Sequence, residues 1–422
     1  MSADAYDVII VGAGPAGAVS ALQLARAGRR VLLLDRHTFP RAKACGDCLS
    51  PEVARQLDAL GVLDEIDGTP HARLAGWHIF APDGARFAGT FARAAAHDER
   101  VRSALAVERR ELDALLVRAA RDEGAELRTG VRVEDVVRQD GRVAGVVVRS
   151  GDGERVTMRA RLVIGADGLR SVVARRIGAT APPGSLRKHS FTVHAELPAG
   201  FTASTGEMHV VVGGCIGIAP VASGALATHN VTFVTLSGAR TGDARAVMRS
   251  MVGEAVGLRD RAALLLESID AAGPPLASGP FDRPTRFAVG DGVALVGDAA
   301  GYYDPFTGQG VCHAIGGALR LAETVHVALA RPGGVTSVDL APYARWLRSR
   351  RRPARTVQRA IEYVTARPRL MNRVSRAIGR APAFGDALVA VTGDIAPARS
   401  LFGRPLLDLG AGVVSQATRS TA

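Results

Sequence analysis

Residues 8–35 read VIIVGAGPAGAVSALQLARAGRRVLLLD, and this stretch decides how the fold begins. Its first four residues are an apolar run that ends at a glycine, which is typical of a buried parallel strand. Residues 15–27 then predict a helix closed by Gly28, and residues 31–34 predict a second buried strand. A strand, a glycine-rich loop, a helix and another strand form the start of a doubly wound sheet.

The loop between the first strand and the helix is a G-x-G-x-x-G sequence. Gly12 permits a tight turn, Gly14 lets the backbone approach a pyrophosphate, and Gly17 allows the helix to pack closely on the strand. The amides of the helix N-terminus then meet the phosphate charge. Asp35 ends the second strand, where a carboxylate binds the hydroxyls of an adenosine ribose. The unit therefore predicts a site for the ADP half of a dinucleotide, and both FAD and NAD satisfy it.

Composition indicates a folded globular chain in a reducing compartment. The 422 residues favour two domains, or one domain with a large insertion. The four cysteines (Cys45, Cys48, Cys215 and Cys312) are too few for a disulfide framework. The N-terminus has no signal-peptide pattern, and no apolar run reaches the roughly eighteen residues of a membrane span. We therefore expect a cytoplasmic protein.

The formal net charge of +12 is concentrated late in the chain. Residues 340–380 contain twelve arginines, no lysine and one acid, Glu362. The arginines recur at three- and four-residue steps, which predicts a basic helix face. Such a face is either simply solvated or makes peripheral contact with an anionic membrane or an acidic carrier protein through Arg345 to Arg380. No aromatic interleaving accompanies the charge, so nucleic acid is not an expected partner.

The rest of the sequence predicts further elements of the nucleotide-binding fold, interrupted by strands of another kind. Helices are predicted at residues 51–60, 110–123 and 308–329, a hairpin at 131–138 and 142–149, short buried strands at 162–164 and 293–296, and alternating strands at 190–197, 209–212 and 228–236. The alternating strands indicate a second, mostly antiparallel sheet. The chain therefore inserts this sheet into the nucleotide fold, which resumes near residue 287.

Two later segments separate FAD from NAD. Ile164 to Ser171 reads IGADGLRS and Leu295 to Gly301 reads LVGDAAG, and each follows a predicted buried strand. With these segments the chain resembles the flavoprotein (group A) monooxygenase superfamily over roughly residues 5–180 and 285–330. The resemblance implies FAD as the cofactor, with Asp167 and Gly168 near the pyrophosphate and the nicotinamide route, and Asp298 on the ribityl chain. Arg109, in the family's R-x-x-L-D pattern, is implied to contact an FAD phosphate.

The resemblance also implies the fold and the extent of the site. The expected fold is α/β: a doubly wound, Rossmann-type FAD-binding domain (residues 1–72, 100–180 and 285–335), an inserted antiparallel substrate domain (73–99 and 181–284) and a C-terminal helical, arginine-rich segment (336–422). After Asp298, glycines open a helix whose amides would aim at the flavin ring. The expected cofactor-binding residues are Gly12, Gly14, Ala16, Gly17, Asp35, Arg36, Cys45, Gly46, Arg109, Asp167, Gly168, Gly297, Asp298, Pro305, Gly308, Gln309, Gly310 and Val311.

Two further segments look like the geranylgeranyl-reductase-like branch of the superfamily. They are Lys43 to Asp47 (KACGD) and Asp304 to Gly308 (DPFTG). In that branch the cysteine lies beside the flavin, so Cys45 is the candidate catalytic residue; the alternative is a small packing residue in a cofactor loop. Gly213 to Pro220 departs from the branch, because its aromatic positions are small here, which predicts a cavity of different shape.

Two functions follow from the resemblance. The first is an NAD(P)H-driven monooxygenase that hydroxylates or epoxidises a hydrophobic or aromatic small molecule, with NAD(P)H visiting transiently as electron donor. The second is a flavin reductase of alkene or quinone groups in a lipophilic substrate. A non-catalytic flavoprotein is a third reading. The C-x-x-C spacing of Cys45 and Cys48 also occurs in thioredoxin-like proteins, but the surrounding pattern is not that of a thioredoxin fold. No metal ligands and no general base are predicted.

Overall fold

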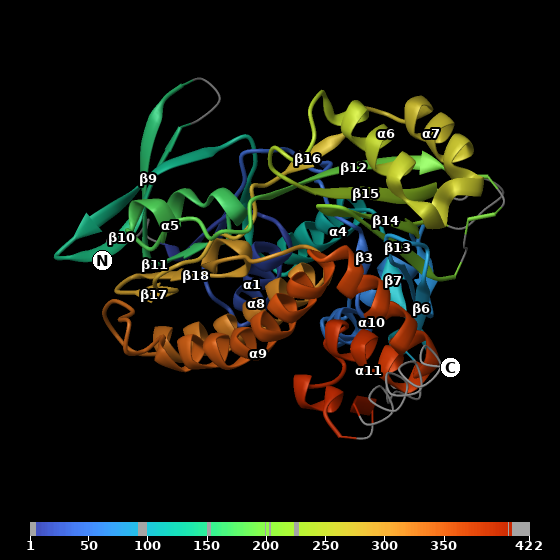
Figure 1. Ribbon diagram of the computed structural model, residues 1–422. Coiled ribbons are helices and arrows are strands. Elements are labelled where there is room, and N and C mark those ends of the chain that lie inside the picture. The colour runs from blue at the N-terminus through green and yellow to red at the C-terminus, as the bar shows by residue number, and fades with distance from the viewer. Residues whose placement is uncertain are drawn as a thin grey trace, which may run out of the picture.

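The computed structural model describes residues 6–91, 99–149, 153–198, 200–201, 204–222, 228–403 and 405–406. Residues 92–98 of the predicted substrate domain and 407–422 of the predicted C-terminal segment therefore lie outside the described residues. The described chain forms an eight-stranded, a seven-stranded and a three-stranded sheet. Figure 1 shows the two large sheets side by side, with the C-terminal helices beneath them.

The predicted nucleotide-binding unit is present. β1 (Tyr6–Val11), α1 (Pro15–Arg26) and β2 (Val31–Leu34) form it, and β1 lies parallel to β2 on one side and to β11 (Arg155–Gly165) on the other. Two more parallel strands extend the sheet: β18 (Val293–Leu295) pairs with β11, and β8 (Glu126–Arg128) pairs with β2. β11 is much longer than the predicted strand at 162–164, because its first half pairs with the hairpin of β9 (Arg132–Gln139) and β10 (Arg142–Arg149).

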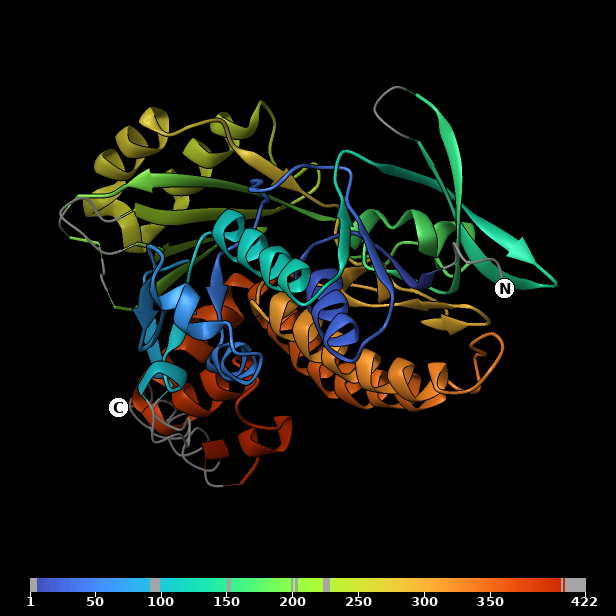
Figure 2. The same ribbon diagram turned by 180° about the vertical axis from the view of Figure 1, so that it is seen from behind.

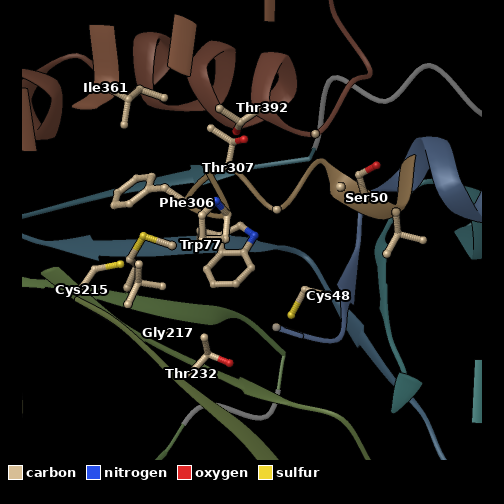
Figure 3. Close-up of a pocket in the computed structure, with 18 of the residues that line it drawn as sticks. Cys48, Ser50, Trp77, Cys215, Gly217, Thr232, Phe306, Thr307, Ile361 and Thr392 are labelled. Carbon is tan, nitrogen blue, oxygen red and sulfur yellow. The ribbon is translucent and has the colours of Figure 1, made fainter. Parts of the chain in front are cut away.

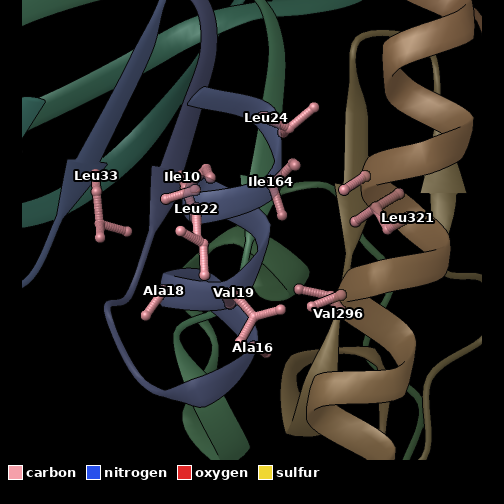
Figure 4. Packing of buried hydrophobic residues seen from close by; sticks show 14 of the residues in the cluster. Ile10, Ala16, Ala18, Val19, Leu22, Leu24, Leu33, Ile164, Val296 and Leu321 are labelled. Carbon is pink, nitrogen blue, oxygen red and sulfur yellow. The ribbon is translucent and has the colours of Figure 1, made fainter. Parts of the chain in front are cut away.

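Three helices that contact one another form a layer against this sheet. Figure 4 shows the side chains of α1 packed between the strands and α8 (Gly310–Leu329), with Leu22 near Ile10 and Leu321 near Val296. From behind, α4 (Arg109–Asp122) lies beside α1 (Figure 2). Every residue of β2 is buried, as a strand covered on both faces requires.

The seven-stranded sheet has a different side chain pattern on each face. Its order is β16 (Leu276–Ser278), β12 (Lys188–Glu196), β15 (Thr228–Leu236), β14 (Gly214–Pro220), β13 (Gly206–Val211), β5 (Gly76–Phe80) and β6 (Arg86–Thr90). Apolar residues such as Val193 and Phe233 pack under α6 (Ala244–Glu254) and α7 (Ala262–Ala271). Their strand neighbours alternate to the other face, which is small and polar: Ser190, Thr192 and His194 on β12, and Asn230 and Thr232 on β15. That polar face is turned toward the nucleotide-binding domain.

The C-terminal segment forms three helices in the described residues. α9 (Ala341–Thr365) lies along α8, whereas α10 (Pro368–Arg380) and α11 (Pro382–Thr392) pack on β6. The three-stranded sheet of β3 (Cys48–Leu49), β7 (Ala104–Ala106) and β4 (Ala72–Leu74), with α2 (Pro51–Ala59), α3 (Leu63–Asp67) and α5 (Val172–Arg176), completes the frame. This architecture confirms the predicted fold class. No helix among the described residues is long and apolar enough to cross a membrane.

Candidate functional site

The glycine loop after β1 is shaped as the sequence predicts. Gly12 has a φ of 98°, and a Cβ there would lie 2.5 Å from the carbonyl oxygen of Ala166. A Cβ on Gly17 would lie 1.8 Å from the carbonyl oxygen of Gly12. A Cβ on Gly14, by contrast, would meet nothing nearer than a terminal nitrogen of Arg41 at 3.7 Å, and Gly14 lines a cavity. The space above Gly14 and the N-terminus of α1 is therefore open to a phosphate group.

The acid at the end of β2 is buried and oriented. Asp35 accepts a hydrogen bond from the Ala13 amide at 2.8 Å and another from the His37 amide at 2.8 Å. These bonds tie the carboxylate to the glycine loop, where an adenosine ribose would lie. Arg36, predicted as a cofactor residue, is exposed and its Nε donates to His37.

Three cations gather near the open side of the loop. Arg109 is buried and donates two hydrogen bonds to Asp113, at 2.8 and 2.9 Å. Burial opposes the charged form of Arg109, but Asp113 outweighs it and raises the pKa of the guanidinium. Arg41 lies 3.3 Å from the same carboxylate, and Lys43 lines the cavity. Burial, followed by the charge of Arg109, lowers the pKa of Lys43. An anion placed among these residues would relieve that repulsion.

The two aspartates of the later motifs have different surroundings. Asp167 accepts hydrogen bonds from the Ser171 hydroxyl at 2.5 Å and from the Val172 amide at 2.6 Å, so its carboxylate holds the start of α5. Burial raises the pKa of Asp167. Asp298 lines the cavity, and no hydrogen bond to its carboxylate occurs among the described side chains and amides. That carboxylate is therefore available to a hydroxyl of a ligand, as the ribityl role requires.

The glycines after Asp298 open a helix at a later residue than predicted. Residues 305–308 form a turn in which the Gly308 amide donates to the Pro305 carbonyl at 3.0 Å, and Gly308 has a φ of 69°. α8 therefore begins at Gly310, not at Gly308, because a left-handed residue cannot continue a right-handed helix. The Gln309 side chain donates to Asp394 at 2.7 Å. Pro305, Gly308, Gly310 and Val311 line the cavity.

The loop that carries Cys45 is fixed to the seven-stranded sheet by a buried acid. Asp47, with a φ of 53°, accepts hydrogen bonds from His194 Nε2 at 2.6 Å and from Asn230 Nδ2 at 2.7 Å. Asn230 Nδ2 also donates to the Cys45 carbonyl at 2.7 Å. Burial raises the pKa of the Cys45 thiol, and Arg109 lowers it in part. Cys45 lines the cavity, and burial favours the protonated form of its thiol.

A single cavity of about 770 Å³ joins these elements. Ala16, Cys45, Gly46, Arg109, Gly168, Gly297 and Asp298 line its nucleotide end. Figure 3 shows its other end, where Cys215, Gly217 and Thr232 of the sheet face Ile361 of α9 and Thr392 of α11 across an open space. The cavity therefore runs from the glycine loop to the C-terminal helices.

Aromatic and aliphatic side chains dominate the far end of the cavity. β14 contributes small residues, as Gly213 to Pro220 predicts, but Trp77 on β5 and Phe306 in the turn before α8 project into the space (Figure 3). Phe87, Phe91, Met371, Val374, Ile378, Phe384 and Leu388 add to the apolar wall. The aromatic lining that β14 lacks thus comes from β5, β6 and the C-terminal helices. The cavity suits a lipophilic molecule.

The residues at the nucleotide end fit FAD. The open space over Gly14, the cations at Arg41, Lys43 and Arg109, and the free carboxylate of Asp298 match a diphosphate joined to a polyhydroxyl chain. The turn at residues 305–310 and Cys45 also line the cavity and would contribute to holding the flavin.

Comparison with known protein families agrees with the assignment of FAD to this site. A family model described as an FAD binding domain matches residues 5–336. The chain belongs to this family. Within the flavoprotein monooxygenase superfamily it falls in the geranylgeranyl-reductase-like branch, and it is an FAD-dependent oxidoreductase.

Curated relatives cover most of the chain. It is 31% identical to a menaquinone reductase of Mycolicibacterium smegmatis over 79% of this chain and 78% of the relative. It is 32% identical to digeranylgeranylglycerophospholipid reductase 2 of Methanopyrus kandleri over 72% of this chain and 73% of the relative. Among solved structures, a geranylgeranyl bacteriochlorophyll reductase-like protein of Thermoplasma acidophilum superimposes with a TM-score of 0.77 at 18% identity, over 98% and 99% of the two chains. A flavin-dependent brominase gives 0.76 at 19%, over 98% and 99%. Both structures show the shared fold alone.

Several site residues are not evident from the sequence. No sequence motif includes Arg41, and its contact with Asp113 is what places it at the site. His194 has no partner that the sequence reveals, and the structure supplies Asp47. Tyr302 lines the cavity, and burial raises its pKa well above the ordinary value. Lys43 and Phe306 lie inside the KACGD and DPFTG segments, so a motif could have pointed to both residues.

Proposed function

We propose that this FAD-dependent oxidoreductase reduces carbon–carbon double bonds of a long lipophilic substrate of the isoprenoid class, with NAD(P)H as electron donor. The cavity carries the proposal: it extends from Cys45 and the turn at 305–310 to the apolar walls of α9, α10 and α11. An extended hydrocarbon chain fits a space whose far end is lined by aliphatic and aromatic side chains. The curated relatives, which are reductases of menaquinone and of digeranylgeranylglycerophospholipid, support the same substrate class.

The overall reaction consumes the alkene, NAD(P)H and one proton, and it releases the saturated product and NAD(P)⁺. FAD, when bound, supplies hydride transfer between the donor and one alkene carbon. The protein must deliver the proton to the other carbon. Cys45 and Tyr302 both line the cavity, and burial raises the pKa of each group, so both are protonated at neutral pH. We assign the proton to Cys45, which lies in the cofactor loop, and a positioning role to Asp47.

The test is a turnover assay under strict anaerobiosis. The FAD-loaded protein is incubated with NADPH and a polyprenyl alcohol, whose reducible groups are carbon–carbon double bonds alone, and products are analysed by mass spectrometry. We expect the substrate mass to rise by two hydrogens without oxygen present. An absolute requirement for oxygen would overturn the reductase proposal.

A second function retains support from one feature of the sheet. Cys215 and Gly217 are small residues where β14 faces the cavity, and a Cβ on Gly217 would meet only the Thr232 carbonyl at 3.8 Å. A compact aromatic ring would fit against this surface. The corresponding reaction is monooxygenation, in which substrate, oxygen, NAD(P)H and a proton give the oxygenated product, water and NAD(P)⁺. Incorporation of labelled oxygen into the product would select this function over reduction.

A further inference from the structure

Helix α9 has two chemically opposite faces. Pro353, Val357, Ile361 and Val364 line the large cavity described above. Arg348, Arg351, Arg352 and Arg355 recur at spacings of three and four residues, so they share the other face of the helix. We call these four residues the basic face. In both views α9 lies along α8 at the lower edge of the molecule (Figures 1 and 2).

The basic face lines a second cavity of about 330 Å³. Arg286, Phe287 and Tyr303 contribute to its wall, and the Arg355 guanidinium lies 5.6 Å from the centre of the Tyr303 ring. Gly297, Asp298, Tyr302 and Gly310 line both cavities. The second cavity therefore borders the FAD end of the first, with these four residues in the wall between them.

The charges in this second cavity are not balanced within the protein. Five arginines line it, and none of them pairs with a carboxylate within 4.0 Å among the described residues. Asp298 and Asp304 also line it, but Lys188 neutralises Asp304 at 3.0 Å. Like charges at three- and four-residue spacing destabilise a helix. Sequence features that lower the stability of a helix in this way occur at functional sites, where a bound ligand offsets the lost stability.

One arginine of the basic face is built into the wall. Arg351 donates hydrogen bonds to the backbone carbonyls of Gly297, at 3.0 Å, and Ala300. It therefore fixes the floor of the cavity next to Asp298. Arg348 and Arg352 are exposed at the rim, where no described side chain or backbone group binds their guanidinium groups. A rigid floor and a free basic rim suit a polyvalent anion.

We propose that this cavity binds the diphosphate of a reduced pyridine nucleotide and so docks the electron donor. The inference deepens the proposed function and rests on it for the identity of the donor. The described chain has one strand–glycine loop–helix unit, which FAD would occupy, so a second dinucleotide needs another phosphate site. The arginines supply bidentate phosphate donors, the aromatic rings at Phe287 and Tyr303 supply surfaces for a base, and the shared wall brings the ligand beside the flavin loops.

Binding to the FAD-loaded protein tests the site directly. Isothermal titration with NADP⁺, inorganic pyrophosphate and a short-chain phosphatidic acid compares the three sources of phosphate. We expect NADP⁺ to bind, pyrophosphate to compete with it, and Arg352→Gln to weaken both by about tenfold to a hundredfold. Arg350→Gln is the matched control, because it removes the same charge from the same helix at a residue that lines neither cavity. Arg352→Lys should restore part of the affinity.

The binding measurements test the proposed phosphate site independently of the proposed reaction. Equal NADP⁺ affinity in Arg352→Gln and Arg350→Gln would overturn the proposal, as would binding of phosphatidic acid but not of NADP⁺. Loss of NADP⁺ binding that is confined to Arg348→Gln and Arg352→Gln would support it. Turnover with dithionite in place of NADPH separates the two proposals. If the lipophilic substrate is not reduced by dithionite-treated protein that still binds NADP⁺, the proposed reaction fails while the docking site stands.

Discussion

Gly12 holds a backbone conformation that a residue with a side chain adopts only under strain. Its φ of 98° and the 2.5 Å that would separate a Cβ from the Ala166 carbonyl oxygen both exclude a larger residue. Asp47 is the opposite case, since it has a φ of 53° despite its side chain. Its bonds to His194 and Asn230 offset that strain. Each residue therefore fixes one loop of the site.

We expect Gly12→Ala to lower the free energy of unfolding of the FAD-free protein by about 1–3 kcal/mol and to abolish retention of FAD on purification. The cause is the clash with the Ala166 carbonyl, which moves the loop out of the phosphate path. Flavin absorbance per mole of protein and a urea titration measure the two effects. Gly28→Ala is the control, because Gly28 also has a positive φ, of 73°, but has open space around it. Equal loss of FAD in both variants would contradict the explanation.

For Cys45→Ala we expect the turnover rate to fall about a hundredfold while FAD content stays at the wild-type level. The substitution removes the proton donor and leaves the anchored carbonyl of residue 45 in place. Cys45→Ser retains an O–H donor and should lose less activity. Steady-state kinetics in water and in deuterium oxide measure the proton step. An unchanged rate and isotope effect in Cys45→Ala would leave Cys45 as a packing residue.

At the scale of elements, the loop of residues 43–48 depends on the seven-stranded sheet for its position. β12 and β15 turn their polar face toward it and supply His194, Asn230, Thr192 and Thr232. α9 likewise serves two sites, because its apolar face closes the large cavity and its basic face lines the second one. In each case one element connects two functional regions.

The contact between His194 and Asp47 makes a pH-dependent contribution to stability. Burial opposes the charged form of His194, but the hydrogen bond and charge of Asp47 outweigh it and raise the pKa of the imidazole above its ordinary value of 6.5. The stabilisation is therefore complete below about pH 6.5 and is lost as the pH rises through the raised pKa. We expect wild-type protein to lose stability over that window, and His194→Gln to lose less. Thermal melts from pH 5.5 to 9 measure this, and parallel curves for the two proteins would refute it.

At the scale of the whole molecule, a buried ion triad joins three parts of the chain. Lys188 of β12 pairs with Asp304 of the cofactor turn at 3.0 Å and with Glu362 of α9. Burial opposes the charge on Lys188, but Asp304 and Glu362 outweigh it and raise the pKa of the ammonium group. The triad therefore fixes the substrate sheet, the turn at 305–310 and the C-terminal helices relative to one another.

We expect Lys188→Met to destabilise the protein by about 3–5 kcal/mol, because it leaves the buried carboxylate of Asp304 without a cationic partner, with only the Phe306 amide bonded to it. Arg118→Met, which breaks the exposed 2.6 Å pair with Glu65, should cost about 0–1 kcal/mol. Chemical denaturation of both variants measures the difference. Similar losses of unfolding free energy in the two variants would show that the buried triad contributes no more to stability than an exposed ion pair.

The outer surface of α10, in the arginine-rich segment, is basic. Arg369, Arg373 and Arg380 are exposed on this helix, while Met371 and Ile378 of the same helix line the large cavity. Tyr363 and Phe402 are 58% and 68% exposed nearby in the C-terminal segment, and Phe402 also lines that cavity. We propose that this surface rests on an anionic membrane, from which a lipophilic substrate enters.

Sedimentation with phosphatidylserine-containing vesicles tests the membrane contact. We expect Arg369→Glu combined with Arg373→Glu to weaken vesicle binding at least tenfold, since each basic residue near such a surface contributes roughly 1 kcal/mol. Arg121→Glu combined with Arg175→Glu makes the same change in net charge at exposed residues of α4 and α5. Equal binding by the two double variants would point to net charge alone.

The sequence by itself determined the nucleotide-binding unit and the class of fold, and the family resemblance of two later motifs selected FAD. It could do so because the requirements of the glycine loop are local: a left-handed turn at Gly12, an open approach at Gly14 and a helix N-terminus follow one another within six residues. Asp298 and the glycines after it were recognisable for the same reason, although the turn at Gly308 delayed the helix by two residues.

Only the tertiary structure decided how the site is completed. Asp47 meets His194 and Asn230 across more than a hundred residues of chain, and Lys188 meets Glu362 across a similar interval. Periodicity predicted that residues 340–380 are helical with a basic face, and the structure divides them into α9 and α10. A periodic pattern does not state what each face packs against. The packing of α9 between two cavities separates the arginines into those that line the second cavity and those that face outward.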